Sequence, residues 1–414
     1  MKLTRTATTG LATLALISCG HGDRLTKSGL AEAETPAEVA AALGMGWNLG
    51  NQLDAWETAE DGRALPGDTL WHNPEIDRRL FTKLSEAGIK TVRIPTTWLD
   101  AVGPAPEYKI DSTWLNHVAD IADMAHDAGL NAIINIHHDG ADSQHWLSIK
   151  DAASDDSASQ KNAQIENQLR AMWTQIGRRF KSYGQWLVFE TMNEIHDGGW
   201  GWGANMSDDD RQYGILNEWQ QVCVDAIRAS GGENASRWIA VQGYVCNPDL
   251  TVKHMKLPTD SAKRTIVSVH FYDPYEYTLN AKYEQWGHKA DSAKKESWGD
   301  EENIRKILGM LKKRFVDNGT PVYLGEIGCV NRDTDEGLSF RRYYLEYLCK
   351  AAKTHDICPM FWDNGYTGTG REQSALIDRR TMEFVYDGEE VLRLMVNAIE
   401  NADSAYTLQS VYDK

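Results

Sequence analysis

The sequence is short of several features that would assign it to a common class of protein. Basic residues are few: 43 lysines and arginines stand against 60 aspartates and glutamates, a net charge of −17. Such an acidic balance argues against nucleic acid or an anionic membrane surface as the main partner. No apolar run is long enough for a transmembrane helix. With 42% apolar and 25% charged residues in 414, the composition is that of a globular protein, neither disordered nor collagen-like.

Cysteine is also scarce, with 6 in the chain. One of them, Cys19, belongs to the N-terminal signal segment, and the odd number that remains cannot all pair within one chain. No Cys-x-x-Cys motif is present, so the cysteines predict no zinc site. Buried free thiols are expected, with a Cys349–Cys358 disulfide as the open alternative. The cysteines beyond the N-terminus are Cys223, Cys246, Cys329, Cys349 and Cys358.

Phenylalanine is less frequent than tryptophan, 8 residues against 15. Core packing alone would favour phenylalanine, whereas a flat indole ring also suits the face of a sugar ring. Trp173, Trp219 and Trp238 fall on helical stripes or in a predicted strand, so we expect them in the core. The excess of tryptophan is therefore a first indication of a carbohydrate ligand.

The first residues have the pattern of an export signal. Lys2 and Arg5 precede an apolar stretch over residues 11–17, and Cys19 follows a small residue. The pattern resembles a bacterial lipoprotein signal over residues 1–19, in which Cys19 becomes lipidated. An ordinary secretion signal with an incidental Cys19 is the alternative. We expect an exported protein, lipid-anchored at the cell surface or outer membrane, or else periplasmic or secreted.

Beyond the signal, residues 20–37 predict a flexible tether and residues 38–405 a single domain. The domain alternates short apolar runs with amphipathic helical stretches, as expected for parallel strands covered by helices. One helix is expected to start at Pro74 with Asn73 as its N-cap. The predicted strands are Gly44–Leu49, Thr91–Pro95, Asn131–His137, Trp186–Thr191, Trp238–Gly243, Thr265–Phe271, Pro321–Gly325 and Cys358–Trp362.

This alternation predicts an α/β fold, a (β/α)8 TIM barrel forming a single catalytic domain. A doubly wound open sheet is the alternative. No Gly-x-Gly-x-x-Gly motif or Walker loop is present, which argues against a nucleotide-binding version of that sheet. Long loops follow several strands, and in a barrel they would lie at the end where active sites are built.

Polar residues end most of the predicted strands, and in a barrel they would meet at one mouth. Stability alone does not require this convergence. Two carboxylates among Arg, His and Tyr suit glycoside hydrolysis, in which one carboxyl protonates the leaving oxygen and the other stabilises the oxocarbenium ion. We expect Arg93 to keep one carboxylate ionised and burial to keep the other protonated. The converging residues are Arg93, His137, His138, Asn193, Glu194, His270, Tyr272, Glu326 and Trp362.

The adjacent histidines His137 and His138 raise the question of a metal site. Neighbouring residues on a strand point to opposite faces of the sheet, and the sequence has no second paired cluster. We therefore predict neither a metal nor a cofactor.

Six segments, in this order, resemble the signature of glycoside hydrolase family 5: Arg93-Ile94-Pro95, Ile136-His137-His138, Met192-Asn193-Glu194, His270-Phe271-Tyr272, Gly325-Glu326 and Phe361-Trp362. The segment from Gly46 to Asn51 is similar to the opening of the bacterial endoglucanase-like members. The resemblance covers about residues 40–400. It implies a retaining (β/α)8 barrel hydrolase.

The resemblance also implies a role for each matching residue. Glu326 would be the nucleophile and Glu194 the acid and then the base, with Arg93 and Tyr272 holding Glu326. Asn193 would bind the 2-hydroxyl of the sugar before the cleavage point, and Trp362 would form the floor of that subsite. His137 and His270 would bind sugar hydroxyls or tune the carboxylates, and His138 is either a second sugar contact or a buried neighbour. Tentative subsite residues are Asn48, Asn51, Trp146, Trp200 and Trp202.

The sequence thus predicts a retaining endo-β-1,4-glucanase that acts on a β-glucan or related polysaccharide chain. We expect a monomer that meets a membrane only through its lipid anchor. The family resemblance leaves xyloglucan, mixed-linkage β-glucan and (gluco)mannan open as the preferred chain. A transglycosylase and a non-catalytic surface glycan-binding lipoprotein also stay open as functions.

Overall fold

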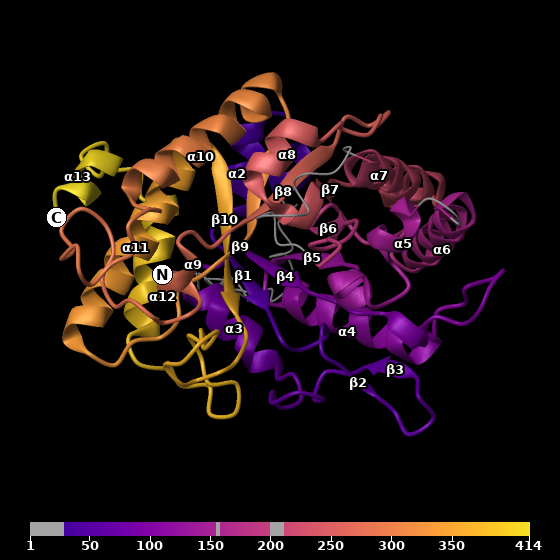
Figure 1. Cartoon of the computed structure of the whole chain (residues 1–414), viewed down its shortest axis with the longest axis horizontal. Helices are drawn as coiled ribbons and strands as arrows, with labels where there is room; N and C mark the ends of the chain where they lie inside the picture. The colour runs from indigo at the N-terminus through magenta and orange to yellow at the C-terminus, as the bar shows by residue number, and fades with distance from the viewer. Residues whose placement is uncertain (1–28, 155–157, 199–210) are drawn as a thin grey trace, which may run out of the picture.

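A closed barrel of parallel strands forms the centre of the molecule, and helices surround it (Figure 1). The computed structural model describes residues 29–154, 158–198 and 211–414. The strands follow one another around the barrel in chain order and β10 closes onto β1. They are β1 (Gly46–Leu49), β4 (Thr91–Ile94), β5 (Asn131–Asn135), β6 (Leu187–Glu190), β7 (Ile239–Gln242), β8 (Thr265–Phe271), β9 (Val322–Ile327) and β10 (Ile357–Asp363).

Each of these strands lies within or overlaps one of the predicted apolar runs, so the (β/α)8 prediction is confirmed and the doubly wound sheet is excluded. The strands are buried along almost their whole length, because side chains fill the barrel interior and helices cover its outside. The expected core tryptophans Trp173, Trp219 and Trp238 are at most 3% exposed.

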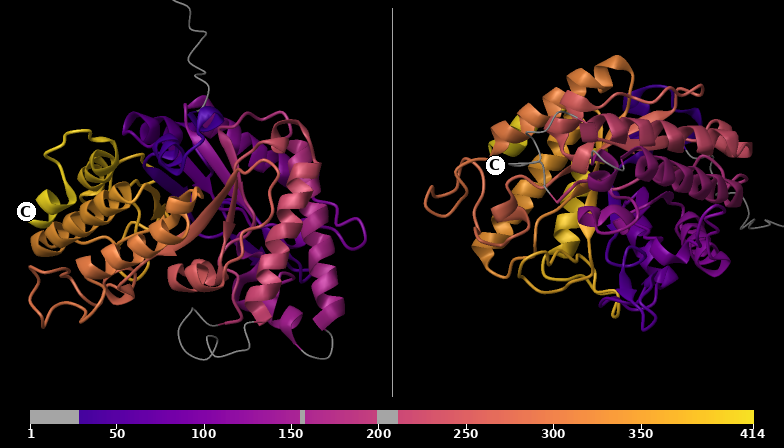
Figure 2. Two further views of the ribbon diagram at one scale, coloured as in Figure 1. Left: turned by 90° about the horizontal axis from the view of Figure 1, so that it is seen from above. Right: turned by 45° about the vertical axis from the view of Figure 1, so that its right-hand side comes forward.

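The helices pack in neighbouring pairs around the barrel, and Figure 2 shows α6 and α7 lying side by side. The larger helices are α3 (Arg78–Glu86), α4 (Ser112–Asp127), α6 (Ala158–Arg179), α7 (Arg211–Ala229), α8 (Pro248–His254), α10 (Glu301–Arg314), α11 (Asp335–Thr354) and α12 (Gly388–Glu400), with short α5 (Ile149–Ala153), α9 (Tyr275–Thr278) and α13 (Leu408–Tyr412). No helix among these described segments is both long enough and apolar enough to cross a bilayer.

The predicted tether over residues 20–37 is too long. Residues 29–43 form two helices, α1 (Gly29–Glu32) and α2 (Pro36–Leu43), and α2 begins with a capping box on Thr35. Leu30, Val39 and Leu43 are buried against the side chains that fill the barrel interior. These two helices, which we call the plug, therefore belong to the domain.

The plug lies at the end of the barrel where the strands begin. The carbonyl of Leu43 accepts a hydrogen bond from the Thr91 hydroxyl at 2.6 Å, and the carbonyl of Ala42 accepts one from the Asn131 amide at 3.0 Å. Thr91 and Asn131 are the first residues of β4 and β5. The plug thus closes the end opposite to the carboxyl ends of the strands.

The expected start of the first long helix is wrong. Helix α3 begins at Arg78 with Asp77 as its N-cap, because the side chain of Asn73 is buried and donates instead to the carbonyls of Asn51 and Asn364. The loop after β1 also contains an antiparallel pair that was not predicted, formed by β2 (Trp56–Thr58) and β3 (Ala64–Pro66).

All the described cysteines are free and buried, including Cys349 and Cys358, so the alternative of a disulfide between these two does not hold. Burial raises the pKa of the Cys349 and Cys358 thiols.

Candidate active site

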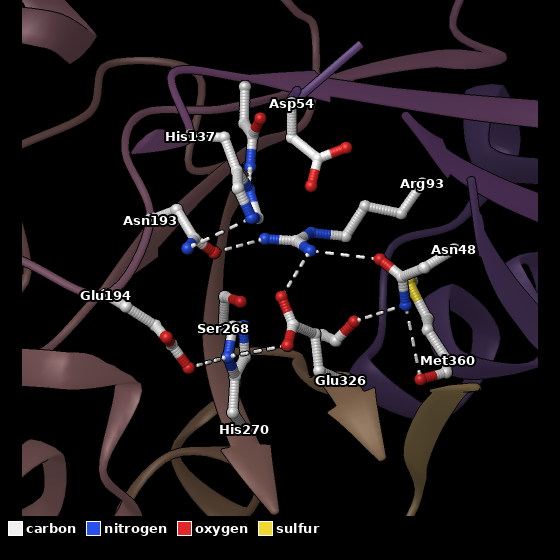
Figure 3. Close-up of polar contacts among 12 residues, drawn as sticks. Asn48, Asp54, Arg93, His137, Asn193, Glu194, Ser268, His270, Glu326 and Met360 are labelled. Atoms are coloured by element: carbon white, nitrogen blue, oxygen red, sulfur yellow. Dashed lines mark hydrogen bonds and ion pairs between the residues drawn. The ribbon is translucent and has the colours of Figure 1, made fainter. Parts of the chain in front are cut away.

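The carboxyl ends of the strands gather the predicted polar residues into one cluster, with Arg93 at its centre (Figure 3). Glu326 comes from β9, His270 from β8 and Arg93 from β4, while Asn193 and Glu194 follow β6. Because parallel strands all end at the same rim, residues far apart in the chain meet here.

Glu326 is 6% exposed and is held by three side chains. Arg93 Nη1 donates to its Oε1 at 2.9 Å, and the Tyr272 hydroxyl donates to its Oε2 at 2.9 Å. His270 Nδ1 lies 3.5 Å from the same Oε2. Both carboxylate oxygens are therefore fixed by groups from separate strands.

Glu194 faces this group from the loop after β6. Its backbone φ of 38° is in the left-handed region, an unfavourable conformation for a residue with a side chain, and such strain is concentrated at functional sites. Its Oε1 lies 2.6 Å from His270 Nδ1. A carboxylate oxygen of Glu194 and one of Glu326 lie within 4.8 Å of each other, with His270 bridging the two.

The pKa directions in this group differ from the expected pattern, in which Arg93 keeps one carboxylate ionised and burial keeps the other protonated. Burial and the nearby Glu194 raise the pKa of Glu326, against the effects of His270, Arg93 and Tyr272. Burial acts to raise the pKa of Glu194, but the contact with His270 lowers it, so that its pKa is lowered overall. Burial lowers the pKa of His270, but the neighbouring Cys246, Glu326 and Glu194 raise it by more. The pKa of His270 therefore lies well above its usual value. The contact between Glu194 and His270 therefore lowers the pKa of the carboxyl and raises that of the imidazole.

A third buried carboxylate, Glu190, was missed because it lies inside the apolar run predicted as a strand. It is the last residue of β6, is fully buried, and accepts from Arg93 Nε at 2.7 Å. An ionisable residue in an otherwise apolar run was the available signal. Arg93 thus lies between two carboxylates, Glu190 and Glu326.

His137 lies between the side-chain amide groups of Asn135 and Asn193. Asn135 Nδ2 lies 3.1 Å from His137 Nδ1, and Asn135 Oδ1 accepts from the Thr96 amide, which fixes the orientation of this side chain. His137 Nδ1 must therefore accept, and the proton of the neutral ring is on Nε2. Burial keeps the ring neutral by lowering the pKa of His137 well below the usual value. Asn193 Nδ2 lies 3.4 Å from Nε2 and is itself a donor, so it cannot accept the Nε2 proton, which stays available to a ligand oxygen.

His138 does not point away from His137 as its place on a strand predicted. The strand ends at Asn135, and the backbone turns at His137, so the two imidazoles pack at 4.5 Å and 80°. His138 Nε2 lies 3.5 Å from the buried carboxylate of Asp54.

Two groups among the described residues have donor atoms close enough to hold a metal ion. In the group of Asp54, His137 and His138, His137 Nδ1 is already taken up by the Asn135 amide. In the group of Glu194, His270 and Glu326, Arg93 already pairs with Glu326, and His270 Nδ1 is in contact with both carboxylates. Both groups are better suited to hydrogen bonding than to metal coordination.

The tentative subsite residues have mixed positions. Asn48 is fully buried in β1, where its Oδ1 accepts from Arg93 and its amide donates to the carbonyl of Gly325. Asn51 forms a turn with φ of 55°. Trp146 packs against the core and donates to Asp139 at 2.6 Å. Trp200 and Trp202 lie outside the described residues.

Trp362 is half-buried at the end of β10, and its ring lies parallel to that of His137, 5.9 Å away. A second aromatic residue near the site, Trp71, was not predicted, and its ring lies 5.8 Å from His138. Four aromatic residues on segments that follow barrel strands have 39–42% exposure: Trp71, Tyr275, Trp298 and Tyr366.

Comparisons with known proteins agree with this geometry. The chain matches the family described as Cellulase (glycosyl hydrolase family 5) over residues 52–368. It is 34% identical to Endoglucanase A of Paenibacillus barcinonensis over 379 residues, 87% of this chain and 90% of that one. Among solved structures, it is similar to a GH5-4 broad specificity endoglucanase from Bacteroides salanitronis, with 51% identity, 92% and 99% coverage of the two chains, and a TM-score of 0.87.

A family 5 xyloglucanase from Paenibacillus pabuli, solved in complex with a ligand, is also similar, with 32% identity, 87% and 100% coverage and a TM-score of 0.79. The fold and the paired carboxylates are those of a retaining glycoside hydrolase barrel. The chain belongs to glycoside hydrolase family 5.

Proposed function

We propose that this protein is an endo-β-1,4-glucanase that cleaves with retention, with Glu326 as the nucleophile and Glu194 as the acid and base. The observation that carries the proposal is the short distance between their carboxylates, whose oxygens come within 4.8 Å. Retaining enzymes have carboxyl groups about 5–5.5 Å apart, whereas inverting enzymes need about 6.5–9.5 Å to admit a water molecule. The short distance favours direct attack by Glu326 on the sugar.

In the first step, a Glu326 oxygen forms a bond to the anomeric carbon while the bond to the leaving oxygen breaks. The leaving oxygen takes a proton from Glu194, and His270, whose Nδ1 lies 2.6 Å from Glu194 Oε1, would supply Glu194 with that proton. In the second step, Glu194 removes a proton from water, the water oxygen attacks the anomeric carbon, and Glu326 departs as a carboxylate.

The surrounding residues would orient the sugar. Asn193 is fixed through Arg93 Nη2, which donates to its Oδ1 at 2.6 Å, and its amide is suited to the 2-hydroxyl. His137 Nε2 would donate to a second hydroxyl. Trp362 would offer its ring face as the floor of the subsite.

The relatives carry names for endoglucanase, broad specificity endoglucanase and xyloglucanase activity. We propose a soluble β-1,4-glucan as the substrate class, with xyloglucan as the second candidate. Exposed aromatic rings on separate loops support a cleft that contacts several sugar units, because each ring can stack on a sugar.

Initial rates on carboxymethylcellulose, barley β-glucan, xyloglucan and glucomannan would rank the substrates. NMR of the first product would show the β-anomer if cleavage proceeds with retention, and the α-anomer would refute the mechanism. Product analysis with an added sugar acceptor separates hydrolysis from transglycosylation. A protein that binds these chains without turnover would instead be a glycan-binding lipoprotein.

We further propose that residues 1–19 direct export and that Cys19 carries the lipid, on the basis of the signal pattern alone. Metabolic labelling with a radioactive fatty acid should mark the wild-type protein and leave Cys19→Ala unlabelled. Labelling of neither protein would favour ordinary secretion.

A further inference from the structure

Glu190 receives hydrogen bonds from four other strands of the barrel. Its Oε2 accepts from Arg93 Nε at 2.7 Å and from Asn135 Nδ2 at 3.0 Å. Its Oε1 accepts from the hydroxyl groups of Ser268 at 2.7 Å and Tyr323 at 2.9 Å. Each oxygen of this fully buried carboxylate therefore has two donors, and its position is fixed.

Arg93 is shared between Glu190 and Glu326, and is itself fully buried. Its Nε donates to Glu190, while its Nη1 donates to Glu326 Oε1 at 2.9 Å. One cation thus serves two carboxylates in a site that water hardly reaches, where charge interactions are strong. Burial lowers the pKa of Arg93, but Glu190 and, to a smaller extent, Glu326 raise it, so that its pKa is raised overall.

This sharing has a chemical consequence for Glu326. A carboxylate that is stabilised by an uncompensated arginine has a low pKa and is a poor nucleophile, since nucleophilicity follows basicity. The pKa of Glu326 is raised by burial and by Glu194, although Arg93 lies in contact with it. Burial also acts to raise the pKa of Glu190. Arg93, Ser268 and His270 together outweigh burial, however, so the pKa of Glu190 is lowered.

We propose that Glu190 is a positioning residue that takes up part of the Arg93 charge and so keeps Glu326 reactive, an inference that rests on the proposed role of Glu326 as the nucleophile. Glu190 does not touch the substrate. It holds the guanidinium plane in place and offsets its charge from behind. Besides Arg93, the charged or titratable groups that face Glu326 are Glu194, His270 and Tyr272. Those that face Glu190 are His270 and Tyr323. Cys246 lies beside His270.

The test is Glu190→Gln, which removes the charge and keeps the shape. A glutamine can direct its oxygen to Arg93 and Asn135 and its amide to Ser268 and Tyr323, because both hydroxyls can accept as well as donate. The variant should therefore fold, which circular dichroism and a melting curve would verify. We expect the acidic limb of kcat/KM to move down by about one pH unit, because unopposed Arg93 lowers the pKa of Glu326.

We also expect the rate of glycosyl-enzyme formation on an aryl β-cellobioside to fall by roughly three- to tenfold, because the nucleophile is less basic. Matched controls are Tyr323→Phe and Ser268→Ala, which each remove one hydrogen bond to Glu190 and leave both charges. Their acidic limbs should not move down. A folded Glu190→Gln protein whose acidic limb stays in place or moves up would overturn the inference and leave Glu190 a purely structural residue.

Failure of the proposed function is distinguishable in the same experiment. A 2-deoxy-2-fluoro cellobioside should label the wild-type protein on the peptide that contains Glu326, as read by mass spectrometry. A label on another carboxylate would refute the role of Glu326 itself. A label on Glu326 together with an unmoved acidic limb would refute only the role of Glu190.

Discussion

His270 Nδ1 lies 2.6 Å from Glu194 Oε1, and this contact joins the two residues into one proton-holding unit. The same nitrogen lies 3.5 Å from Glu326 Oε2, so the imidazole stands between the two carboxylates. A cation at this place reduces the repulsion between Glu194 and Glu326, which allows them to approach to the distance that retention needs.

The first prediction concerns the two carboxylates. Glu194→Gln and Glu326→Gln should each lower kcat on a polysaccharide by several orders of magnitude, because each removes one of the two groups that the mechanism uses. The variants Glu194→Ala and Glu326→Ala separate the two roles when azide is added with an activated aryl cellobioside. Glu194→Ala should give the β-glycosyl azide and Glu326→Ala the α-glycosyl azide, and the reverse pairing would exchange the assignments.

The pH dependence should report the pair of Glu194 and His270. Because the pKa of His270 is raised, the pair keeps its proton below that pKa and loses it as the pH rises through it. Replacing His270 by Asn leaves only Glu194 to hold the proton, so the basic limb of kcat/KM should move to lower pH. His355→Asn, on a helix end away from the site, should leave the limb in place. If the basic limb of kcat/KM is unchanged in His270→Asn, His270 takes no part in the proton transfer.

Trp71 should contribute to the binding of long chains. Its ring is 39% exposed and reaches the site through His138. Trp71→Ala should raise KM for β-glucan by roughly five- to tenfold, from the loss of one stacking contact, with little change of kcat on an aryl cellobioside. Tyr386→Ala is the matched control, since Tyr386 is 50% exposed but lies beside Arg342 and Arg393 on the outer helices. Equal effects in the two variants would count against a subsite at Trp71.

The plug should contribute to stability and not to catalysis. Leu43 is 1% exposed against the barrel interior, so Leu43→Ala should lower the free energy of unfolding by about 2–5 kcal/mol with kcat unchanged. Ala41→Ser, at an exposed position on the same helix, should change little. Denaturant unfolding measures both. A loss of activity in folded Leu43→Ala would show that the plug affects the site.

The thiols should be unreactive in the native protein. Burial raises the pKa of Cys223, Cys349 and Cys358, which leaves little thiolate and no access for a reagent. In a protein that begins after Cys19, Ellman's reagent should detect no thiol until denaturant is added and then all of the free cysteines. Detection of two thiols fewer in the denatured protein would indicate a disulfide bond.

The barrel could be predicted because each strand is a short apolar run between amphipathic helices, a signal that is local in the sequence. The plug could not, because its few apolar residues, such as Leu30 and Val39, are separated by alanine and glutamate. Their burial depends on the open end of the barrel, a feature that exists only after the strands have closed.

The converging strand ends could be predicted as well, since most of them carry a polar residue. Glu190 offered one signal, an ionisable side chain inside an apolar run, but its partner could not be predicted, because only the layering of side chains inside the barrel brings it beneath Arg93. The orientation of His138 was predicted wrongly, since strand alternation stops at Asn135 and the turn at His137 brings both rings together.

The position of the plug also has a consequence for the proposed attachment through Cys19. Helix α1 begins at Gly29 in the plug, whose last residues Ala42 and Leu43 bind the first residues of β4 and β5, while the carboxylates lie at the opposite rim. An attachment through residues 1–28, as proposed above, would therefore join the domain at the plug end, opposite to the carboxylates. With that attachment, a long polysaccharide would reach the mouth of the barrel from the side away from the anchor.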